Sequence, residues 1–190
     1  MRILLIRHGA TEWSEAGRHT GRTDLPLTSA GIAQARALGG ALSRERIART
    51  LVSPLQRAIK TAEIAGLTPY TVIDDLAEVD YGSDEGRTTP EIRGDHPGWH
   101  FFTHGTHGGE TLAQVGERCA RVLALLTGDD TTALVAHGHL LRIFTAVFLG
   151  EQPAWGHHLG IGTASIGVLG LEHGRPAIIR WNDQSHLGVL

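Results

Sequence analysis

The chain has 190 residues, 41% of them hydrophobic, with a formal net charge of −3 and a sequence pI near 6.4. This length is enough to bury one substantial core, so we expect residues 1–190 to form a single domain. The weakly acidic charge argues against a nucleic-acid-binding protein, and no apolar run is long enough for a membrane span.

The first predicted element is a strand over residues 3–6, which ends at Arg7, His8 and Gly9. Its unbroken apolar sequence is typical of a strand buried on both faces. Ligands of open α/β sheets bind beyond the carboxyl ends of the strands, so we expect Arg7 and His8 at the edge of a site. Residues 10–27 predict a loop that crosses this edge.

From residue 28 the chain alternates between helical and strand patterns. Thr28 and Thr111 are typical helix N-caps, and Pro54 suits a first helical turn. The predicted elements are a helix from the Thr28 cap to residue 42, a strand over 50–53, a helix over 55–65, a strand over 70–73, a helix start at 88–93, a helix from the Thr111 cap to 126, a strand over 132–136 and a helix over 139–149. Residues 74–86 predict a loop, and residues 94–109 an ordered irregular segment.

The end of the chain predicts a β-hairpin. Two apolar, β-rich segments, residues 164–171 and 177–181, are separated by a Gly- and Pro-containing turn. A strand–helix alternation followed by a hairpin predicts a three-layer α/β/α sandwich with a mostly parallel sheet and an antiparallel C-terminal hairpin.

Charged and polar residues with catalytic potential follow each predicted strand of the parallel part. Arg7 and His8 follow the first strand, Arg57 the second, Glu78 the third and His137 the fourth. Strand ends that meet at one edge of a sheet would bring these residues together. Two arginines with two histidines form a cationic site suited to a phosphoryl group, which guanidinium groups bind through paired hydrogen bonds.

The same residues suggest a reaction. A histidine among cations is held neutral, and it can attack phosphorus if its other ring nitrogen donates to a backbone carbonyl. We therefore assign His8 as the nucleophile and Arg7, Arg57 and His137 as phosphate-binding residues. Glu78 would protonate the departing alkoxide and then activate water. This chemistry requires neither a metal nor another cofactor.

Five ordered motifs resemble the histidine phosphatase superfamily, which is also called phosphoglycerate-mutase-like. They are residues 5–12 (Leu-Ile-Arg-His-Gly-Ala-Thr-Glu), 53–62 (Ser-Pro-Leu-Gln-Arg-Ala-Ile-Lys-Thr-Ala), 76–86 (Leu-Ala-Glu-Val-Asp-Tyr-Gly-Ser-Asp-Glu-Gly), 109–111 (Gly-Glu-Thr) and 135–138 (Val-Ala-His-Gly). The resemblance implies the same roles: His8 as the phosphorylated residue, Glu78 as the proton donor, and Arg7, Arg57 and His137 as the phosphate pocket.

Within that family the chain resembles the phosphatase branch, including sedoheptulose-bisphosphatase-like enzymes and small bacterial acid phosphatases. The mutases carry an asparagine where this chain has Ser14 and a lysine where it has Thr89. An adjacent arginine pair of the mutases is also missing here. By the same resemblance the residues that we expect to contact substrate are Ser14, Thr20, Gly21, Tyr81, Gly138 and His139.

Several residues leave alternatives open. Arg18 and Arg22 could hold a second phosphate of a substrate or belong to a solvated loop. Glu85 competes with Glu78 as proton donor. The aromatic residues of the irregular segment could wall the substrate pocket or anchor the segment to the core; they are Trp99, Phe101 and Phe102.

Twelve histidines invite a metal hypothesis. Three pairs have ligand-like spacing: His137 with His139, His104 with His107, and His157 with His158. No zinc-binding motif accompanies them, so we expect no metal and leave the roles of His104 and His107 open.

The sequence thus predicts a metal-independent phosphatase whose ligand is a small phosphorylated metabolite. The single cysteine, Cys119, excludes an intrachain disulfide and favours a cytoplasmic location. We expect no nucleic-acid or membrane partner, and a homodimer stays open. The alternatives are a phosphoglycerate mutase and a non-catalytic phospholigand-binding protein on the same fold.

Overall fold

A mixed six-stranded sheet organises the computed structural model, which describes residues 1–188. The strands are β1 (Arg2–Arg7), β2 (Arg49–Val52), β3 (Thr71–Val72), β4 (Thr131–Ala136), β5 (Ile166–Glu172) and β6 (Arg175–Asp183). Their order is β3-β2-β4-β1-β5-β6. The first four strands in this order are parallel to one another, and β5 is antiparallel to both of its neighbours, β1 and β6. This arrangement confirms the predicted fold class.

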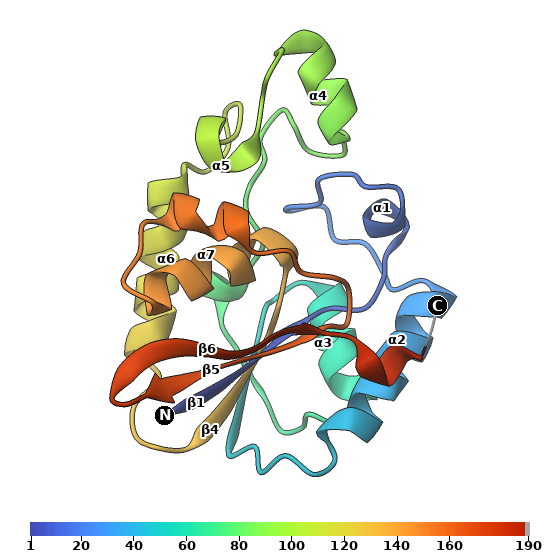
Figure 1. Ribbon diagram of the computed structural model, residues 1–190. Helices are drawn as coiled ribbons and strands as arrows, with labels where there is room; N and C mark the ends of the chain where they lie inside the picture. The colour runs from blue at the N-terminus through green and yellow to red at the C-terminus, as the bar shows by residue number, and fades with distance from the viewer. Residues whose placement is uncertain (189–190) are drawn as a thin grey trace.

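Helices cover both faces of the sheet (Figure 1). One face carries α2 (Ser29–Leu42) and α3 (Gln56–Ile64), and the other α6 (Leu112–Ala124) and α7 (Gly138–Phe148). The shorter elements are the helices α1 (Glu12–Glu15), α4 (Thr89–Asp95) and α5 (Phe101–His104) and the 3-10 turns η1 (Asp74–Leu76), η2 (Pro153–His158) and η3 (Ser185–Leu187).

The first strand lies inside the sheet, between β4 and β5, and belongs to both layers of the core. Ile3 and Leu5 pack on the side of α6 and α7, whereas Leu4 and Ile6 pack on the side of α2 and α3. All four side chains are 0% exposed, as the sequence predicts. Full burial of each such side chain stabilises the fold by about 1.5–3 kcal/mol. The strand that ends at Arg7 and His8 is therefore rigidly held.

Helix starts follow the predicted caps. The Thr28 side chain accepts a hydrogen bond from the Gly31 backbone N–H, and Thr111 accepts one from Gln114. The loop prediction for residues 10–27 misses α1, a single turn closed by hydrogen bonds between Thr11 and Ser14. A helix of one turn is too short to show a periodic pattern, which explains the omission.

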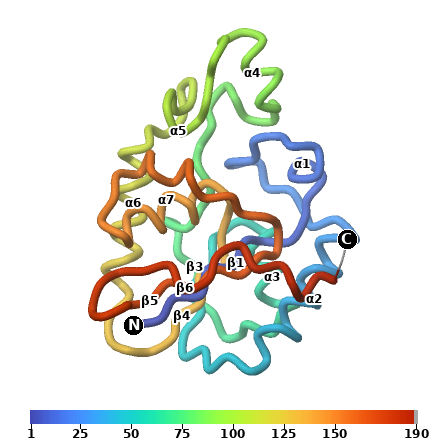
Figure 2. The backbone as a smooth tube through the Cα atoms, in the orientation of Figure 1, coloured from blue at the N-terminus to red at the C-terminus, as the bar shows by residue number. Residues whose placement is uncertain are grey.

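The predicted third strand is reduced to two residues, and the irregular segment 94–109 contains α5. Figure 2 shows that α1, α4 and α5 gather beyond one end of the sheet. Isolated β-bridges tie these loops together, Arg18 to Thr88 and Gly82 to His107. Among the described residues no helix is both long and apolar enough to cross a membrane. The ordered loops therefore build up one end of the molecule, beside the end of β1.

Candidate active site

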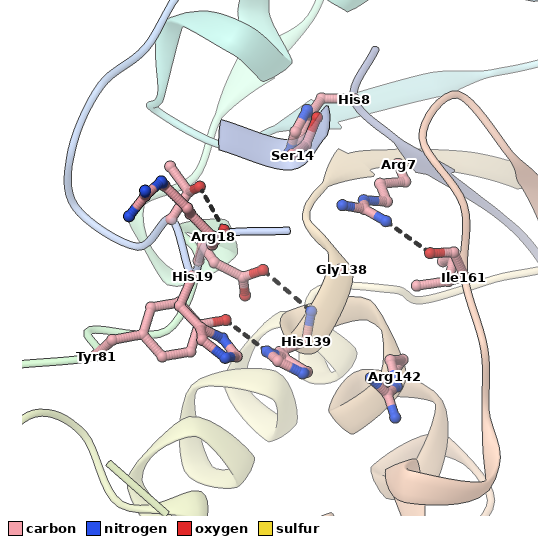
Figure 3. Close-up of a pocket in the computed structure, with 12 residues that line it drawn as sticks. Arg7, His8, Ser14, Arg18, His19, Tyr81, Gly138, His139, Arg142 and Ile161 are labelled. Carbon is pink, nitrogen blue, oxygen red and sulfur yellow. Dashed lines mark hydrogen bonds between the residues drawn. The ribbon is translucent and has the colours of Figure 1, made fainter. Parts of the chain in front are cut away.

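A cavity of about 130 Å³ opens where β1 ends (Figure 3). It is bordered by β1, the loop after it, the segment after η1 and the start of α7. The residues that line it are Arg7, His8, Ser14, Arg18, His19, Thr20, Glu78, Tyr81, Gly138, His139, Arg142 and Ile161. Most residues predicted to form the site therefore share one cavity, although they come from distant parts of the sequence.

His8 is buried, and its ring is held by its own backbone. The Nδ1 atom lies 2.7 Å from the carbonyl oxygen of Gly9. A carbonyl oxygen only accepts, so Nδ1 carries the proton and the lone pair is on Nε2. Burial, followed by the charges of Arg57 and Arg7, lowers the pKa of His8 well below its ordinary 6.5. His8 is therefore neutral at pH 7, as a nucleophile must be.

Arg7 offers an unpaired donor beside His8. Its Nη1 donates to the carbonyl oxygen of Ile161 at 2.7 Å, whereas its buried Nε has no hydrogen-bond partner among the described residues. Burial lowers the pKa of Arg7, and the nearby Glu78 and Tyr81 oppose this change. Leaving a buried charged donor unpaired is costly, so this Nε is a natural contact for a bound anion.

Glu78 is held by backbone N–H groups at the start of α7. Its Oε1 accepts from Val79 at 3.0 Å and from Leu140 at 2.9 Å, and its Oε2 accepts from His139 at 3.0 Å. A carboxylate offers about four acceptor positions, which leaves one open on Oε2. Oε2 is therefore the Glu78 oxygen that can make a further hydrogen bond without loss of the backbone contacts.

Arg57 and His137 lie next to the cavity but do not line it. The rings of His137 and His8 are 5.0 Å apart, centroid to centroid. His137 Nδ1 accepts from Arg57 Nε at 3.1 Å, so its Nε2 carries the proton and donates to Ser53 Oγ at 2.7 Å. The remaining hydrogen bonds of Arg57 go to backbone carbonyl oxygens, those of Thr20, Gly21 and Thr23. Both side chains thus contact the protein at nearly every polar atom.

Tyr81, which is buried, and His139, which is half-buried, form a hydrogen-bonded pair in the cavity wall. The phenol oxygen lies 2.5 Å from His139 Nδ1. Burial, with the charges of Glu78 and Glu85, raises the pKa of Tyr81 well above its ordinary value. Burial also lowers the pKa of His139 well below 6.5. Both groups are therefore uncharged at pH 7.

The other predicted substrate contacts divide into two groups. Ser14, Thr20 and Gly138 line the cavity, but Gly21 does not. The Ser14 hydroxyl is hydrogen-bonded to the backbone of Thr11, as acceptor at 2.8 Å and as donor at 2.9 Å. Gly21 instead supports the loop, since its carbonyl accepts from Arg57. Its N–H donates to the carboxylate of Glu85.

Glu85 holds the loop that crosses the site. Its Oε1 accepts from the backbone N–H groups of Gly21 at 2.9 Å and Thr23 at 3.0 Å. It does not line the cavity, whereas Glu78 does. The geometry therefore favours Glu78 over Glu85 as the proton donor.

The two loop arginines have different positions. Arg18 lines the cavity, but its Nη1 donates to the Gly86 carbonyl at 2.6 Å and lies 3.5 Å from Glu91. The side chain of Arg22 is 73% exposed and is paired with Asp80 at 2.7 Å, away from the cavity. Of the two, only Arg18 is placed where it could meet a substrate.

The irregular segment is anchored by its aromatic residues. Trp99, Phe101 and Phe102 are 2–4% exposed, as core anchors would be, and they also line a second cavity next to the first. His107 is hydrogen-bonded to the buried Asp84 at 2.8 Å and supports this segment. His104 is exposed, and its Nδ1 contacts only the backbone of His100. Neither histidine lines the first cavity.

The three histidine pairs do not extend into larger ligand sets. Among residues 1–188 no group of three or more His, Cys, Asp or Glu side chains is arranged to hold a metal ion. His137 uses both ring nitrogens on Arg57 and Ser53, while His139 contacts Tyr81. His157 Nδ1 donates to the Ala154 carbonyl oxygen, within its own helical turn, at 2.9 Å.

The sequence analysis assigned no role to several residues of the site, although Ser53 and Thr61 belong to the motif at residues 53–62. Ser53 fixes the His137 ring, and Thr61 accepts from the Gly9 N–H at 3.0 Å. The Ile161 carbonyl orients Arg7, and a backbone carbonyl carries no sequence signature. Arg142, four residues after Gly138 on α7, lines both cavities; its helical spacing from a predicted site residue could have found it.

Comparisons with known proteins show what this chain is similar to. Residues 3–184 match the family described as "Histidine phosphatase superfamily (branch 1)". An acid phosphatase of Mycobacterium tuberculosis is 43% identical over 178 residues, 91% of this chain and 88% of the relative. The sedoheptulose 1,7-bisphosphatase of Saccharomyces cerevisiae is 35% identical, over 78% of this chain and 68% of its own. The phosphoserine phosphatase of Entamoeba histolytica, solved with 3-phosphoglyceric acid, superimposes with a TM-score of 0.87 at 30% identity, over 98% of both chains.

Proposed function

Because the chain belongs to branch 1 of the histidine phosphatase superfamily, we propose that it hydrolyses small phosphomonoesters through a phosphohistidine at His8. It is a phosphoric monoester hydrolase, since an acid phosphatase and a phosphoserine phosphatase match it over 88% and 95% of their own lengths. One observation carries the proposed mechanism: a neutral His8 with its lone pair on Nε2 shares a cavity with the unpaired Nε of Arg7. A nucleophile and an oxyanion donor are thus preorganised in one place.

In the first step His8 attacks the phosphoryl group. The Nε2 lone pair forms a bond to phosphorus while the bond from phosphorus to the ester oxygen breaks. The departing oxygen takes the proton that Glu78 carries on Oε2. Arg7 donates to the phosphoryl oxygens, whose charge it balances during transfer.

In the second step water releases the phosphate. Glu78, now a carboxylate, takes a proton from the water as its oxygen bonds to phosphorus. The bond from phosphorus to Nε2 breaks, and the electron pair returns to His8. The hydrogen bond from Nδ1 to Gly9 holds the ring in place through both steps.

We propose that Arg57 and His137 support the reaction indirectly, through their effect on His8 and on the loop beside it. The charge of Arg57 helps to keep His8 unprotonated, and its hydrogen bonds hold the loop at residues 20–23 and the ring of His137. A direct contact of either side chain with phosphate remains a prediction. It would require one of these hydrogen bonds to open.

The substrate class that we propose is small phosphorylated metabolites. The cavity measures about 130 Å³, which favours a small ligand. Named relatives act on sugar bisphosphates and phosphoserine, which are compounds of this kind. We also propose a cytoplasmic location, because the one cysteine, Cys119, is buried and free.

The direct test is to trap the phosphoenzyme. Purified protein is mixed with radiolabelled phenyl phosphate in the presence of a chelator, quenched within milliseconds, and assayed for protein-bound phosphate that is stable to base and labile to acid. We expect such a species in the wild type and none in His8→Ala, with phosphate release reduced by at least about 10³-fold. His173→Ala is the control, because His173 is exposed in the β5–β6 turn. Undiminished turnover by His8→Ala would contradict the mechanism.

The alternative function, that of a phosphoglycerate mutase, is tested on the same purified protein. At the two mutase-specific positions Ser14 and Thr89 lack the amide and the ammonium group of the mutases; the Ser14 hydroxyl bonds to the Thr11 backbone, and Thr89 contacts His19 at 3.2 Å. We therefore expect 3-phosphoglycerate to lose phosphate faster than it becomes 2-phosphoglycerate, as read by NMR of the phosphorus resonances. Faster isomerisation would make the protein a mutase.

A further inference from the structure

The motif at residues 109–111 is not used in the proposed reaction, yet it joins α6 to the segment that carries Glu78. The Glu110 N–H donates to the Asp80 carbonyl at 2.9 Å, and the Asp80 N–H donates to Glu110 Oε2 at 2.9 Å. A Cβ on Gly109 would clash with the same carbonyl oxygen, so this close approach requires glycine there. The motif therefore attaches this segment to the start of the helix.

Arg118, in the middle of α6, directs its guanidinium group at the same segment. Its Nε and Nη2 donate to the two carboxylate oxygens of Glu110, at 2.8 and 2.9 Å. Its Nη1 donates to the carbonyl oxygens of Asp75 at 2.7 Å and Ala77 at 2.9 Å, and Nη2 lies 3.5 Å from that of Glu78. The side chains of Arg118 and Glu110 are only 12% and 19% exposed. This bidentate, largely buried ion pair is stronger than an ordinary surface salt bridge.

Glu78 is thereby held at both ends. Residues 77–80 belong to no helix or strand, so no regular backbone hydrogen bonds fix their position. Arg118 contacts the backbone from the side of α6, whereas the N–H groups of His139 and Leu140 bind the carboxylate at the start of α7. Because both ends are fixed, the open acceptor position on Oε2 has one direction.

We propose that Glu110 and Arg118 are positioning residues for the proton donor: they fix the backbone of Glu78 and so direct its Oε2 at the departing oxygen. The inference rests on the proposed function, to which it adds two residues that lie outside the cavity. A general acid must lie within hydrogen-bonding reach of its target, and a displacement of about 1 Å costs about 10²-fold in rate. Without Arg118, two backbone carbonyls and the Glu110 carboxylate lose their donor, so the segment would shift toward water.

Arg121 offers a matched control on the same helix. Its Nε and Nη2 donate to the Asp75 carboxylate at 2.8 and 2.7 Å, so it also joins α6 to the segment after β3. Its side chain is 59% exposed and has no hydrogen bond to residues 77–80. Loss of this contact should weaken the same junction without releasing Glu78.

The test compares kcat/KM for propyl phosphate, whose departing oxygen needs a proton, with that for 2,4-dinitrophenyl phosphate, whose departing oxygen needs none. In Arg118→Met we expect a fall of about 10²-fold for propyl phosphate and of less than about fivefold for the dinitrophenyl ester. A merely structural role would lower both values equally. Arg121→Met should stay within about twofold of the wild type for both esters.

Two milder variants and a double variant extend the test. Glu110→Gln should show the same selectivity to a smaller extent, and Arg118→Lys, which keeps a charge beside Glu110, should recover part of the loss. Because the pair acts as a unit, Glu110→Gln/Arg118→Met should lose no more than about threefold beyond Arg118→Met. Circular dichroism and thermal unfolding check that each variant is folded. If Arg118→Met is not, Glu110→Gln and Arg118→Lys decide the proposal.

The outcomes separate this inference from the proposed function. Equal losses for the two esters in the folded variants, or the same selective loss in Arg121→Met, would overturn the positioning role while the phosphatase reaction stands. A wild type that hydrolyses neither ester would contradict the proposed function instead. The positioning of Glu78 is then decided by crystal structures of the wild type and Arg118→Met. A Glu78 carboxylate displaced from the N–H groups of His139 and Leu140 supports it, and an unchanged one overturns it.

Discussion

At the scale of single residues, the polar atoms that the fold leaves free support the choice of the proposed reacting groups. The backbone uses one nitrogen of His8 and leaves the other, and it leaves the Nε of Arg7 without a partner. Glu78 keeps one acceptor position open on Oε2. Neighbouring groups of the same type, Arg57 and His137, are nearly saturated by contacts with the protein. Unpaired hydrogen-bonding atoms, more than residue type, therefore distinguish the proposed reacting side chains from the supporting ones.

The first prediction distinguishes the two loop carboxylates. In Glu78→Gln we expect kcat/KM to fall by about 10²–10⁴-fold for alkyl phosphates, whose leaving oxygen needs a proton. The loss should be much smaller for 2,4-dinitrophenyl phosphate, whose leaving group needs none. In Glu85→Gln, which weakens the support of Gly21 and Thr23, we expect lower stability and the same relative loss for both substrates. Steady-state kinetics and urea unfolding measure these effects, and a uniform loss in Glu78→Gln would contradict its role.

The second prediction concerns two glycines that have different reasons to be glycine. A Cβ on Gly9 would lie 2.4 Å from the Gly31 carbonyl oxygen of α2, so Gly9→Ala must move backbone and should destabilise by about 1–3 kcal/mol. A Cβ on Gly138 would lie 3.5 Å from Arg7 Nε, an ordinary contact that nevertheless occupies space beside the unpaired donor.

For Gly138→Ala we therefore expect unchanged stability with a several-fold higher KM. Chemical denaturation and kinetics on both variants provide the measurement. A Gly9→Ala protein as stable as the wild type would show that α2 can shift away from β1.

At the scale of elements, the C-terminal segment holds one wall of the site. Side chains that follow β5 make hydrogen bonds to four backbone groups of residues 160–164, and these bonds come from Trp181, Asn182, Gln184 and His186. The same stretch contains Ile161, whose carbonyl orients Arg7. The end of the chain thus positions an arginine that lies near its beginning.

The third prediction follows from this contact. Asn182 has a φ of +50°, and its Oδ1 accepts from the Gly162 N–H at 2.7 Å. Asn182→Gly keeps the backbone geometry but removes the acceptor, so we expect a several-fold loss in kcat/KM with a small change in Tm. Asn182→Asp keeps the acceptor and tolerates this φ, so it should remain close to wild type. Equal effects of the two substitutions would show that the amide does not position the loop.

At the scale of the whole molecule, the fold keeps three histidines of the site uncharged, the buried His8 and His137 and the half-buried His139. Burial is the main cause that lowers the pKa values of His8, His137 and His139 well below 6.5. In the unfolded chain they titrate near that ordinary value. Below it the unfolded state binds more protons than the native state, so acid favours unfolding.

The fourth prediction is a pH dependence of stability. The stabilisation that the neutral histidines provide is complete above pH 6.5 and is lost as pH falls below it, by up to about 1.4 kcal/mol per pH unit for each histidine. Urea unfolding between pH 7.5 and 5 measures this slope. In His139→Gln we expect a smaller slope, because one such group is gone. A flat profile between pH 6.5 and 5 would contradict the lowered pKa values.

The sequence by itself determined the fold class, the order of the elements and most of the cavity. Buried strands and capped helices are local patterns, and the parallel topology brings the ends of strands to one edge; Arg7, His8 and Glu78 could therefore be placed together. Short elements such as α1 and α5 were not predictable, because one helical turn has no periodicity.

The tertiary structure alone decided which polar atoms are used and which are free. Segments that are distant in sequence meet where Arg57 contacts a backbone carbonyl and where the Ile161 carbonyl supports Arg7. They also meet in the lining of the second cavity, which includes Arg142. Such contacts depend on how loops pack against one another, and no local pattern specifies that packing. The candidate nucleophile could thus be named from the sequence, whereas the partners of each polar atom around it could be identified only from the structure.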